Sequence, residues 1–250
     1  DTIGTKETIL NFNRRAVLAY AGSQYSAPKM IVSLAGRVGA KEVGLAKKYF
    51  SPLAKKAYHD KLKTDDSQAR PGLKLHYKKT DQAHLSLGVR ALPYAQPDEL
   101  IVKVMALLLG GSMSSRLFTE LRERRGLAYY VRTHDEPYTD SGYLTTQAGV
   151  PIAKLGQAIK IILSEYKKLL DRPVKAEELS RVKECLAGRG ALELESSEAV
   201  ANWFGRQAIL AKEQGESSGG ILTPGEYYAR IKKISVADIS RVAKKIFRNE

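Results

Sequence analysis

Apolar residues recur at intervals of three and four positions over much of the chain, and this periodicity predicts amphipathic helices. The clearest case is 153–170, whose leucine, isoleucine and tyrosine side chains share one helical face. The predicted helices cover 5–23 (two short helices separated near Asn13), 41–50, 97–109, 112–125, 153–170, 176–213 (interrupted near 188–190 or 196–197), 224–231 and 236–247.

Shorter stretches of alternating or β-branched apolar residues predict strands between these helices. They are 30–34, 73–79, 83–91, 127–134 and 142–150. The last two flank the turn-rich sequence DEPYTDS and are expected to form a β-hairpin. Helices combined with antiparallel strands indicate an α+β fold.

Residues 53–72 are polar, end in a Pro-Gly pair and contain few apolar side chains, as is typical of a linker. A helix that ends in an aromatic residue occurs on both sides of this linker, as RRAVLAYAGSQY and as ADISRVAKKIF. The first copy leads into the predicted strand MIVSL. We therefore expect 1–52 to be the C-terminal part of one domain. We expect 73–250 to be a second domain that stops before its last strand.

The net charge of +14 could attract nucleic acid or acidic membranes, but its distribution argues against both. The 41 basic residues are spread along the chain as short pairs on amphipathic stretches, which is typical of solvated helix faces. No apolar run reaches the length that spans a membrane. Neither a nucleic-acid nor a membrane partner is therefore assigned. The sequence encodes no compartment, and the cytoplasm is only a default expectation.

The sequence lacks the usual signatures of an autonomous catalyst. Cys185 is the only cysteine, which excludes an internal disulfide and a cysteine-based zinc cluster. The histidines are His59, His76, His84 and His134, and no H-x-x-E-H or H-x-x-x-H pair occurs. His76 and His84 lie on neighbouring predicted strands, where a structural pair is favoured over a metal site. The Gly-Gly pair at 110–111 is interpreted as a helix stop and not as a phosphate loop.

Three central segments carry a family resemblance: DQAHLSLGVRALPYAQPD, LLGGSMSSRLFTELRERRGLAYYV and EPYTDSGYLTTQAG. They resemble the insulinase/pitrilysin family of zinc metallopeptidases, which includes the mitochondrial processing peptidase. The N-terminal segment 4–38 and the closing helix 235–247 are similar to that family as well. The resemblance implies a LuxS/MPP-like metallohydrolase fold, in which an antiparallel sheet has helices packed on one face. It also implies that 1–52 is a partial copy of the same fold.

The resemblance places the metal outside this chain. In the family, zinc is held by an H-x-x-E-H motif in the N-terminal domain, and this chain has no such motif. The resemblance therefore implies no cofactor in the chain itself. It implies Zn²⁺ in a metal-binding domain, either in the same full-length chain or in a partner subunit. The chain alone is expected to be inactive.

Arg122 and Tyr129 match the arginine and tyrosine, seven residues apart, by which the family's second domain contacts substrate. An arginine can hold a peptide carbonyl or a developing oxyanion, and a tyrosine hydroxyl can donate to the same oxygen. Without the resemblance, Arg122 would be a charge at a helix C-terminus and Tyr129 an ordinary strand aromatic. The resemblance therefore implies the substrate-binding, non-metal portion of a zinc endopeptidase that acts on a peptide or an unfolded protein. A non-catalytic scaffold of the same family is the alternative.

Overall fold

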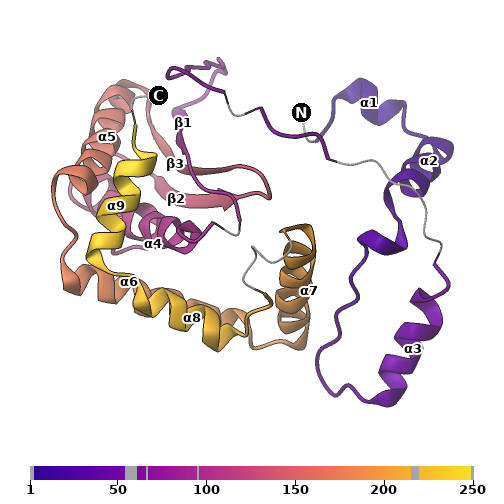
Figure 1. The fold of residues 1–250 in the computed structure, drawn as a ribbon. Coiled ribbons are helices and arrows are strands. Elements are labelled where there is room, and N and C mark those ends of the chain that lie inside the picture. The colour runs from indigo at the N-terminus through magenta and orange to yellow at the C-terminus, as the bar shows by residue number, and fades with distance from the viewer. Residues whose placement is uncertain (1–2, 54–60, 66, 95, 215–219, 249–250) are drawn as a thin grey trace. The chain divides into compact units, whose positions relative to one another are not determined.

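The computed structural model describes residues 3–53, 61–65, 67–94, 96–214 and 220–248, which fall into two compact units (Figure 1). Unit 1 consists of Asp1–Lys63 and Ser196–Ile209, and unit 2 consists of Thr64–Glu195 and Leu210–Glu250. No described helix is long and apolar enough to cross a membrane. The division into 1–52, a linker and 73–250 stays a prediction. Residues 54–60 and 66 of that linker lie outside the described residues.

Unit 1 contains short helices joined by irregular chain. They are α1 (Lys6–Leu10), α2 (Arg14–Gln24), a 3-10 turn (Ala27–Lys29), α3 (Ala40–Phe50) and the first part of α7 (Ser197–Gln214). The break near Asn13 is confirmed, because its side chain accepts a hydrogen bond from the Ala16 amide and begins α2. The predicted strand 30–34 is wrong. Residues 30–34 form irregular chain, and the described part of unit 1 contains no strand with which they could pair.

Unit 2 is built on a three-stranded antiparallel sheet, with the order β1 (Gln82–Arg90), β3 (Gly142–Pro151), β2 (Tyr130–Pro137). The predicted hairpin is confirmed as β2 and β3. The predicted strand 73–79 is wrong, because these residues run as irregular, exposed chain. In the described sheet, β1 and β2 are therefore the two edge strands.

The two faces of the sheet differ in character. Ala148 of β3 lies between Leu85 and Val131 in the register, and these side chains face the helices. By the alternation of a strand, Arg132 and His134 lie on the opposite face. One face is thus apolar and buried, and the other carries polar and ionisable groups.

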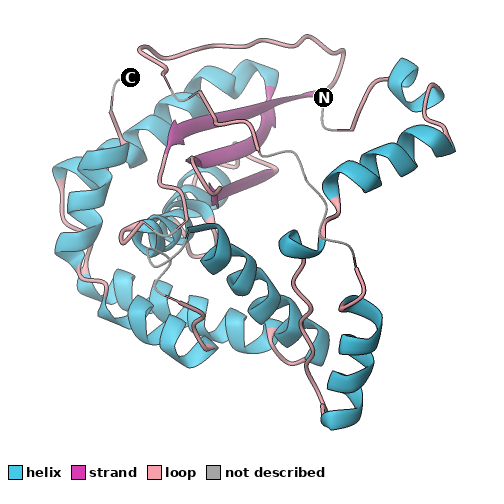
Figure 2. Cartoon of the chain, turned by 45° about the vertical axis from the view of Figure 1, so that its right-hand side comes forward, coloured by secondary structure: helices cyan, strands magenta, loops and turns pink. Residues whose placement is uncertain are grey.

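Helices cover the apolar face (Figures 1 and 2). Those that lie against the sheet are α4 (Glu99–Gly110) and α5 (Leu155–Asp171), and α6 (Ala176–Glu193), α8 (Pro224–Lys233) and α9 (Val236–Ile246) pack on these two helices. Helix α4 lies against β2, and α9 packs on α4 and α5. The predicted α+β fold, an antiparallel sheet with helices on one face, is thereby confirmed for unit 2.

One helix boundary differs from the prediction, and another decides between two predicted places. Helix α4 begins at Glu99 after the N-cap Asp98, so Pro97 precedes the helix instead of occupying its first position. The long predicted region 176–213 is interrupted at 194–196, the second of the two predicted places. There the chain passes from unit 2 into unit 1. The predicted loop 215–220 lies outside the described residues, except for Gly220.

Candidate functional site

The central segment 110–131 begins where α4 touches the sheet. A Cβ added to Gly110 would lie 2.7 Å from the backbone nitrogen of Thr133, and closer still to its hydroxyl. Glycine is therefore needed for the close approach of α4 to β2. Gly111 caps α4 at φ −87°, so the helix does not end in a left-handed cap. The Gly-Gly pair is a helix stop, as predicted, but close packing fixes Gly110.

A bidentate ion pair holds the next part of the segment to α6. The Nε and Nη2 atoms of Arg116 each lie 2.7 Å from one carboxylate oxygen of Glu178. Both side chains are largely shielded from solvent, which strengthens a charge-assisted pair of this geometry. The helical turn that follows is therefore anchored to the helical layer of unit 2.

That turn is a π-helix, η2 (Phe118–Glu123), in which the Arg124 amide donates to the carbonyl oxygen of Thr119 at 2.9 Å. The regular helix predicted over 112–125 is wrong in its extent and its type, because only residues 116–123 are helical. Leu117 and Leu121 are fully buried beneath the turn. Single π-helical turns of this kind occur frequently at functional sites.

A left-handed glycine connects this turn to the sheet. Gly126 has φ +57° and no neighbour that would meet a Cβ, so its backbone conformation alone favours glycine. Its amide donates to the carbonyl of Arg122, and the Tyr129 amide donates to the carbonyl of Gly149 on β3. Arg122 and Tyr129 thus lie on either side of one tight turn.

The three arginines of LRERRG are not equivalent. Arg124 Nη1 lies 2.6 Å from Glu120 Oε1, and Arg125 also forms an ion pair with the Glu120 carboxylate. The hydrogen bond from Arg125 lowers the pKa of Glu120. Arg122 has no carboxylate within ion-pairing distance among the described residues, and its guanidinium lies over the ring of Phe118, 5.1 Å from the centroid. The segment therefore leaves one arginine available.

The side chain of Tyr129 is likewise available to a ligand. Its side chain is 61% exposed. Its hydroxyl has no hydrogen-bond partner within the described part of the chain. The guanidinium of Arg122 and the phenol of Tyr129 thus have no hydrogen-bond or ion-pair partner among the described residues.

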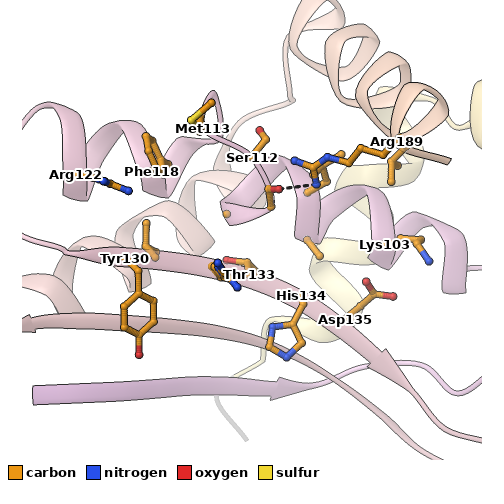
Figure 3. A pocket seen from close by; sticks show the side chains of 17 residues that line it. Lys103, Ser112, Met113, Phe118, Arg122, Tyr130, Thr133, His134, Asp135 and Arg189 are labelled. Carbon is orange, nitrogen blue, oxygen red and sulfur yellow. Dashed lines mark hydrogen bonds between the residues drawn. The ribbon is translucent and has the colours of Figure 1, made fainter. Parts of the chain in front are cut away.

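A cavity of about 750 Å³ opens beside Arg122 (Figure 3). Its walls come from α4, the 110–113 turn, η2, α6 and six consecutive residues of β2, 130–135. Tyr130, and not Tyr129, contributes to this lining. The structure therefore places Arg122 at the cavity and Tyr129 outside its lining, one residue before β2 begins.

The histidines do not form the predicted cross-strand pair. His76 lies in the irregular segment, because 73–79 is not a strand. His84 instead faces Tyr130, with 3.1 Å between Nδ1 and the hydroxyl and 6.0 Å between the ring centroids. His134 lines the cavity, and His59 lies outside the described residues.

Lys103 forms, with Glu99 and Asp135, a half-buried group of charges that the sequence analysis missed. Burial raises the pKa of Glu99 to about 7 and also raises that of Asp135. Burial opposes the charge of Lys103, but attraction to Tyr227, Asp135 and Glu99 raises its pKa above the usual range. The available signal was ELIVKVMALLLG, in which a glutamate and a lysine one helical turn apart interrupt an apolar helix.

The described residues contain no group of three or more His, Cys, Asp or Glu side chains that could hold a metal ion. Zinc therefore does not fit this site, and no reaction step through a metal is assigned to these residues. The arrangement offers hydrogen-bond donors and positive charge beside β2, which is an edge strand of the described sheet. Such groups can hold a peptide carbonyl or a carboxylate.

Comparison with known proteins identifies the family. The sequence profile described as the peptidase M16 inactive domain matches residues 11–186. The chain belongs to the peptidase M16 family. This match confirms the resemblance to the insulinase/pitrilysin peptidases. Relatives of the chain are named zinc proteases, in agreement with the expected class of metallopeptidase.

Two such relatives are bacterial. A protein of Bacillus subtilis named an uncharacterized zinc protease is 32% identical over 209 residues, which cover 83% of this chain and 50% of the relative. A Rickettsia bellii protein of the same description is 31% identical over 247 residues, which cover 98% of this chain and 57% of the relative. The chain thus spans about half the length of the relatives that it matches.

Solved structures share the fold. A protease from Helicobacter pylori has a TM-score of 0.81 at 22% identity, over 99% of this chain and 59% of that one. A peptidase M16 inactive domain from Pseudomonas fluorescens has a TM-score of 0.78 at 20% identity, over 98% of this chain and 57% of that one. At these identities the likeness establishes the fold alone.

Proposed function

We propose that this M16 chain is the substrate-binding, non-metal portion of a zinc-dependent endopeptidase. The observation that carries the proposal is that the side chains of Arg122 and Tyr129 have no polar partner among the described residues. Glu120 engages the neighbouring arginines, whereas Arg122 and Tyr129 have no described polar partner on either side of the Gly126 turn. An arginine that is left unpaired beside a cavity is suited to a ligand group.

In this proposal, Arg122 and Tyr129 hold the peptide near the bond that is cleaved. The guanidinium donates to the carbonyl oxygen of the peptide. The Tyr129 hydroxyl donates to the same oxygen. Because the carbonyl oxygen gains negative charge as the bond is attacked, both hydrogen bonds strengthen in the transition state. The substrate is a peptide or an unfolded protein, because the group that accepts both hydrogen bonds is a main-chain carbonyl.

The metal belongs, in this proposal, to an H-x-x-E-H domain in the same full-length chain or in a partner subunit. When bound there, zinc supplies an activated water for hydrolysis. Two observations support such a partner: the relatives are about twice as long as this chain, and unit 1 leaves its apolar side chains uncovered. We infer that 1–52 is the C-terminal part of a preceding metallopeptidase-like domain whose remainder covers those side chains.

The test is peptide hydrolysis by the natural protein that contains these 250 residues together with an H-x-x-E-H domain. The double variant Arg122→Ala, Tyr129→Phe is expected to lower kcat/KM by about 100-fold or more, because two transition-state donors are lost. Arg124→Ala is the matched control. It removes an arginine that pairs with Glu120 and does not line the cavity, so it is expected to leave kcat/KM within about threefold.

The scaffold alternative makes the opposite prediction. If the natural protein hydrolyses no peptide, or if the double variant retains the full rate, Arg122 and Tyr129 have no part in hydrolysis. A folded double variant, with the thermal transition of the unaltered protein, is needed before either result is interpreted. That transition is measurable by circular dichroism on the same samples.

A further inference from the structure

The guanidinium of Arg122 lies over the ring of Phe118, with 5.1 Å between the guanidinium carbon and the ring centroid (Figure 3). This distance is within the range of a favourable cation–π contact. Both residues belong to η2 and are four positions apart, so one turn carries the ring and the charge. The contact is therefore local and depends on no segment outside η2.

The turn that carries the ring is held firmly in unit 2. Arg116, which precedes η2, forms the bidentate ion pair with Glu178 of α6, and Leu121 is fully buried below the turn. Phe118 is half-buried and packs against the same core, whereas Arg122 is exposed. The ring is thus a fixed surface against which a long, exposed side chain is held.

A ring and a carboxylate hold an arginine in different ways. The N–H donors of a guanidinium lie in its plane, so a carboxylate that pairs with it occupies donors. Glu120 occupies donors of Arg124 and Arg125 in this way. A ring contacts the face of the guanidinium and leaves the donors free. The contact with Phe118 therefore restricts Arg122 while its donors stay available to a ligand.

We propose that Phe118 is a positioning residue, which holds the guanidinium of Arg122 in the orientation that donates to the peptide carbonyl. An exposed arginine side chain has many rotamers, and this freedom is lost when the side chain is ordered in the transition state. The ring removes part of that freedom before the substrate binds. A cation–π contact at an exposed site corresponds to about two- to fivefold in rate. This inference rests on the proposed function, because it explains how one of the two donors is held.

The contact is tested first without hydrolysis, by NMR spectroscopy of the 250-residue chain. A proton above the face of an aromatic ring resonates upfield, so the Nε–H group of Arg122 is expected to be shifted upfield in the unaltered chain. The variant Arg122→Lys identifies this resonance by its loss. Phe118→Leu keeps an apolar side chain but removes the ring, and it is expected to abolish the shift and to increase the ps–ns mobility of the Nε–H group.

Phe247→Leu is the matched control for this measurement. Phe247 is also half-buried against the core of unit 2, but its ring stacks on Tyr166, with 4.6 Å between the centroids. Its loss is expected to lower the thermal transition of the chain, as the loss of any packed ring does. The Arg122 resonance is expected to stay where it is in the unaltered chain.

The effect on the rate is measured in the natural protein that the proposed function requires. Phe118→Leu is expected to lower kcat about two- to fivefold with little change in KM, because the orientation of Arg122 matters most in the transition state. Phe118→Tyr keeps the ring and is expected to restore kcat, and Phe247→Leu is expected to leave kcat unchanged. In an Arg122→Ala background, Phe118→Leu is expected to have no further effect on kcat.

Fluorinated phenylalanines at position 118 separate the cation–π contact from packing. Fluorine withdraws electron density from the face of the ring and changes its size little, so each added fluorine weakens the attraction to a cation. We expect kcat to fall with each fluorine and to approach the Phe118→Leu value for trifluorophenylalanine. Equal kcat throughout this series would overturn the inference, because the ring would then act through packing alone.

The positioning role and the proposed function fail in different ways. An Arg122 resonance that is the same in Phe118→Leu overturns the positioning role, as does an equal loss of kcat with and without Arg122. Low activity of Arg122→Ala together with an unaltered rate of Phe118→Leu also overturns it and leaves the proposed function standing. If the natural protein hydrolyses no peptide, the proposed function fails, and the NMR measurement still decides whether Phe118 holds Arg122.

Discussion

The two units of this chain use their apolar residues in opposite ways. Every buried apolar side chain among the described residues lies in unit 2, within 101–182 or 231–246. In unit 1, the apolar side chains of α1, α2 and α3 are exposed or only partly covered. Examples are Leu18, which is 54% exposed, and Phe50, which is 47% exposed. A similar helical periodicity thus produces a core in one unit and an uncovered face in the other.

The difference teaches that periodicity predicts a helix but not what covers it. Most of the stability of a protein helix comes from packing of its apolar face. The helices of unit 2 receive that packing from the sheet and from one another, so Arg122 and the cavity lie on a firmly held scaffold. Unit 1 lacks it, and its stability is expected to be low in this chain alone.

The largest expected effect comes from truncating a leucine in each unit. Leu144 of β3 is fully buried, so Leu144→Ala is expected to lower the free energy of unfolding of unit 2 by about 3 kcal/mol. Leu18→Ala in α2 is expected to change stability by less than about 0.5 kcal/mol. Urea unfolding followed by circular dichroism measures both. The single tryptophan, Trp203, lies in the α7 portion of unit 1 and reports that unit by fluorescence.

Equal effects of the two leucine variants, or coincident transitions by circular dichroism and fluorescence, would contradict the claim that only unit 2 has a packed core. Coincidence would mean that the units unfold as one cooperative body. Separate transitions, with the tryptophan signal changing at lower urea, are the expected result.

Two glycine variants, one in each unit, test the same difference in packing. Gly110→Ala places a Cβ 2.7 Å from the backbone nitrogen of Thr133, so that one of the two segments has to shift, and is expected to cost about 2 kcal/mol. Gly22→Ala in α2 meets nothing within 4 Å and is expected to stabilise that helix by about 0.5–1 kcal/mol. Urea midpoints measure the first change, and amide hydrogen exchange over α2 measures the second. A neutral Gly110→Ala would contradict the close approach of α4 to β2.

The half-buried charges of unit 2 give a smaller effect, which depends on pH. Burial raises the pKa of Glu99 to about 7, whereas an unfolded glutamate titrates near about 4.3. The folded state therefore holds the proton more tightly, and this contribution to stability is complete below about pH 4. It is lost as the pH rises to about 7. Glu99→Gln should remove this dependence and stabilise unit 2 by about 1 kcal/mol at pH 8, with little change at pH 4.

The control for this variant is Glu195→Gln, which removes an exposed carboxylate. It should leave the pH dependence of the urea midpoint as it is in the unaltered chain. If Glu99→Gln destabilised unit 2 at pH 8, attraction between Glu99 and Lys103 would outweigh the burial of Glu99.

Local patterns were sufficient for most of the fold. The helices at 155–171 and 236–246 and the hairpin of β2 and β3 follow from periodicity and turn residues. The strands expected at 30–34 and 73–79 are absent from the described sheet, because a strand is stabilised by its neighbours more than by its own residues. The π-helical turn could not be foreseen, because Leu117 and Leu121, which are buried below it, are spaced as in an ordinary α-helix.

The candidate site was predictable in its residues but not in its surroundings. The family resemblance selected Arg122 and Tyr129, and composition alone would not have done so. The role of Glu120, the ion pair of Arg116 with Glu178 and the cavity along β2 depend on contacts between distant segments. Such contacts leave no periodic signal in the sequence.

The most direct test of the account compares two proteins in one assay of peptide hydrolysis and bound zinc. One is this 250-residue chain, and the other is the natural protein in which, under the proposed function, the chain acts with an H-x-x-E-H domain of the same chain or of a partner subunit. The account predicts that the natural protein binds zinc and cleaves a quenched fluorescent peptide. The chain alone is predicted to bind no stoichiometric zinc and to show no rate above buffer. Zinc-dependent cleavage by the chain alone would contradict the central claim that it is the substrate-binding part of a shared active site.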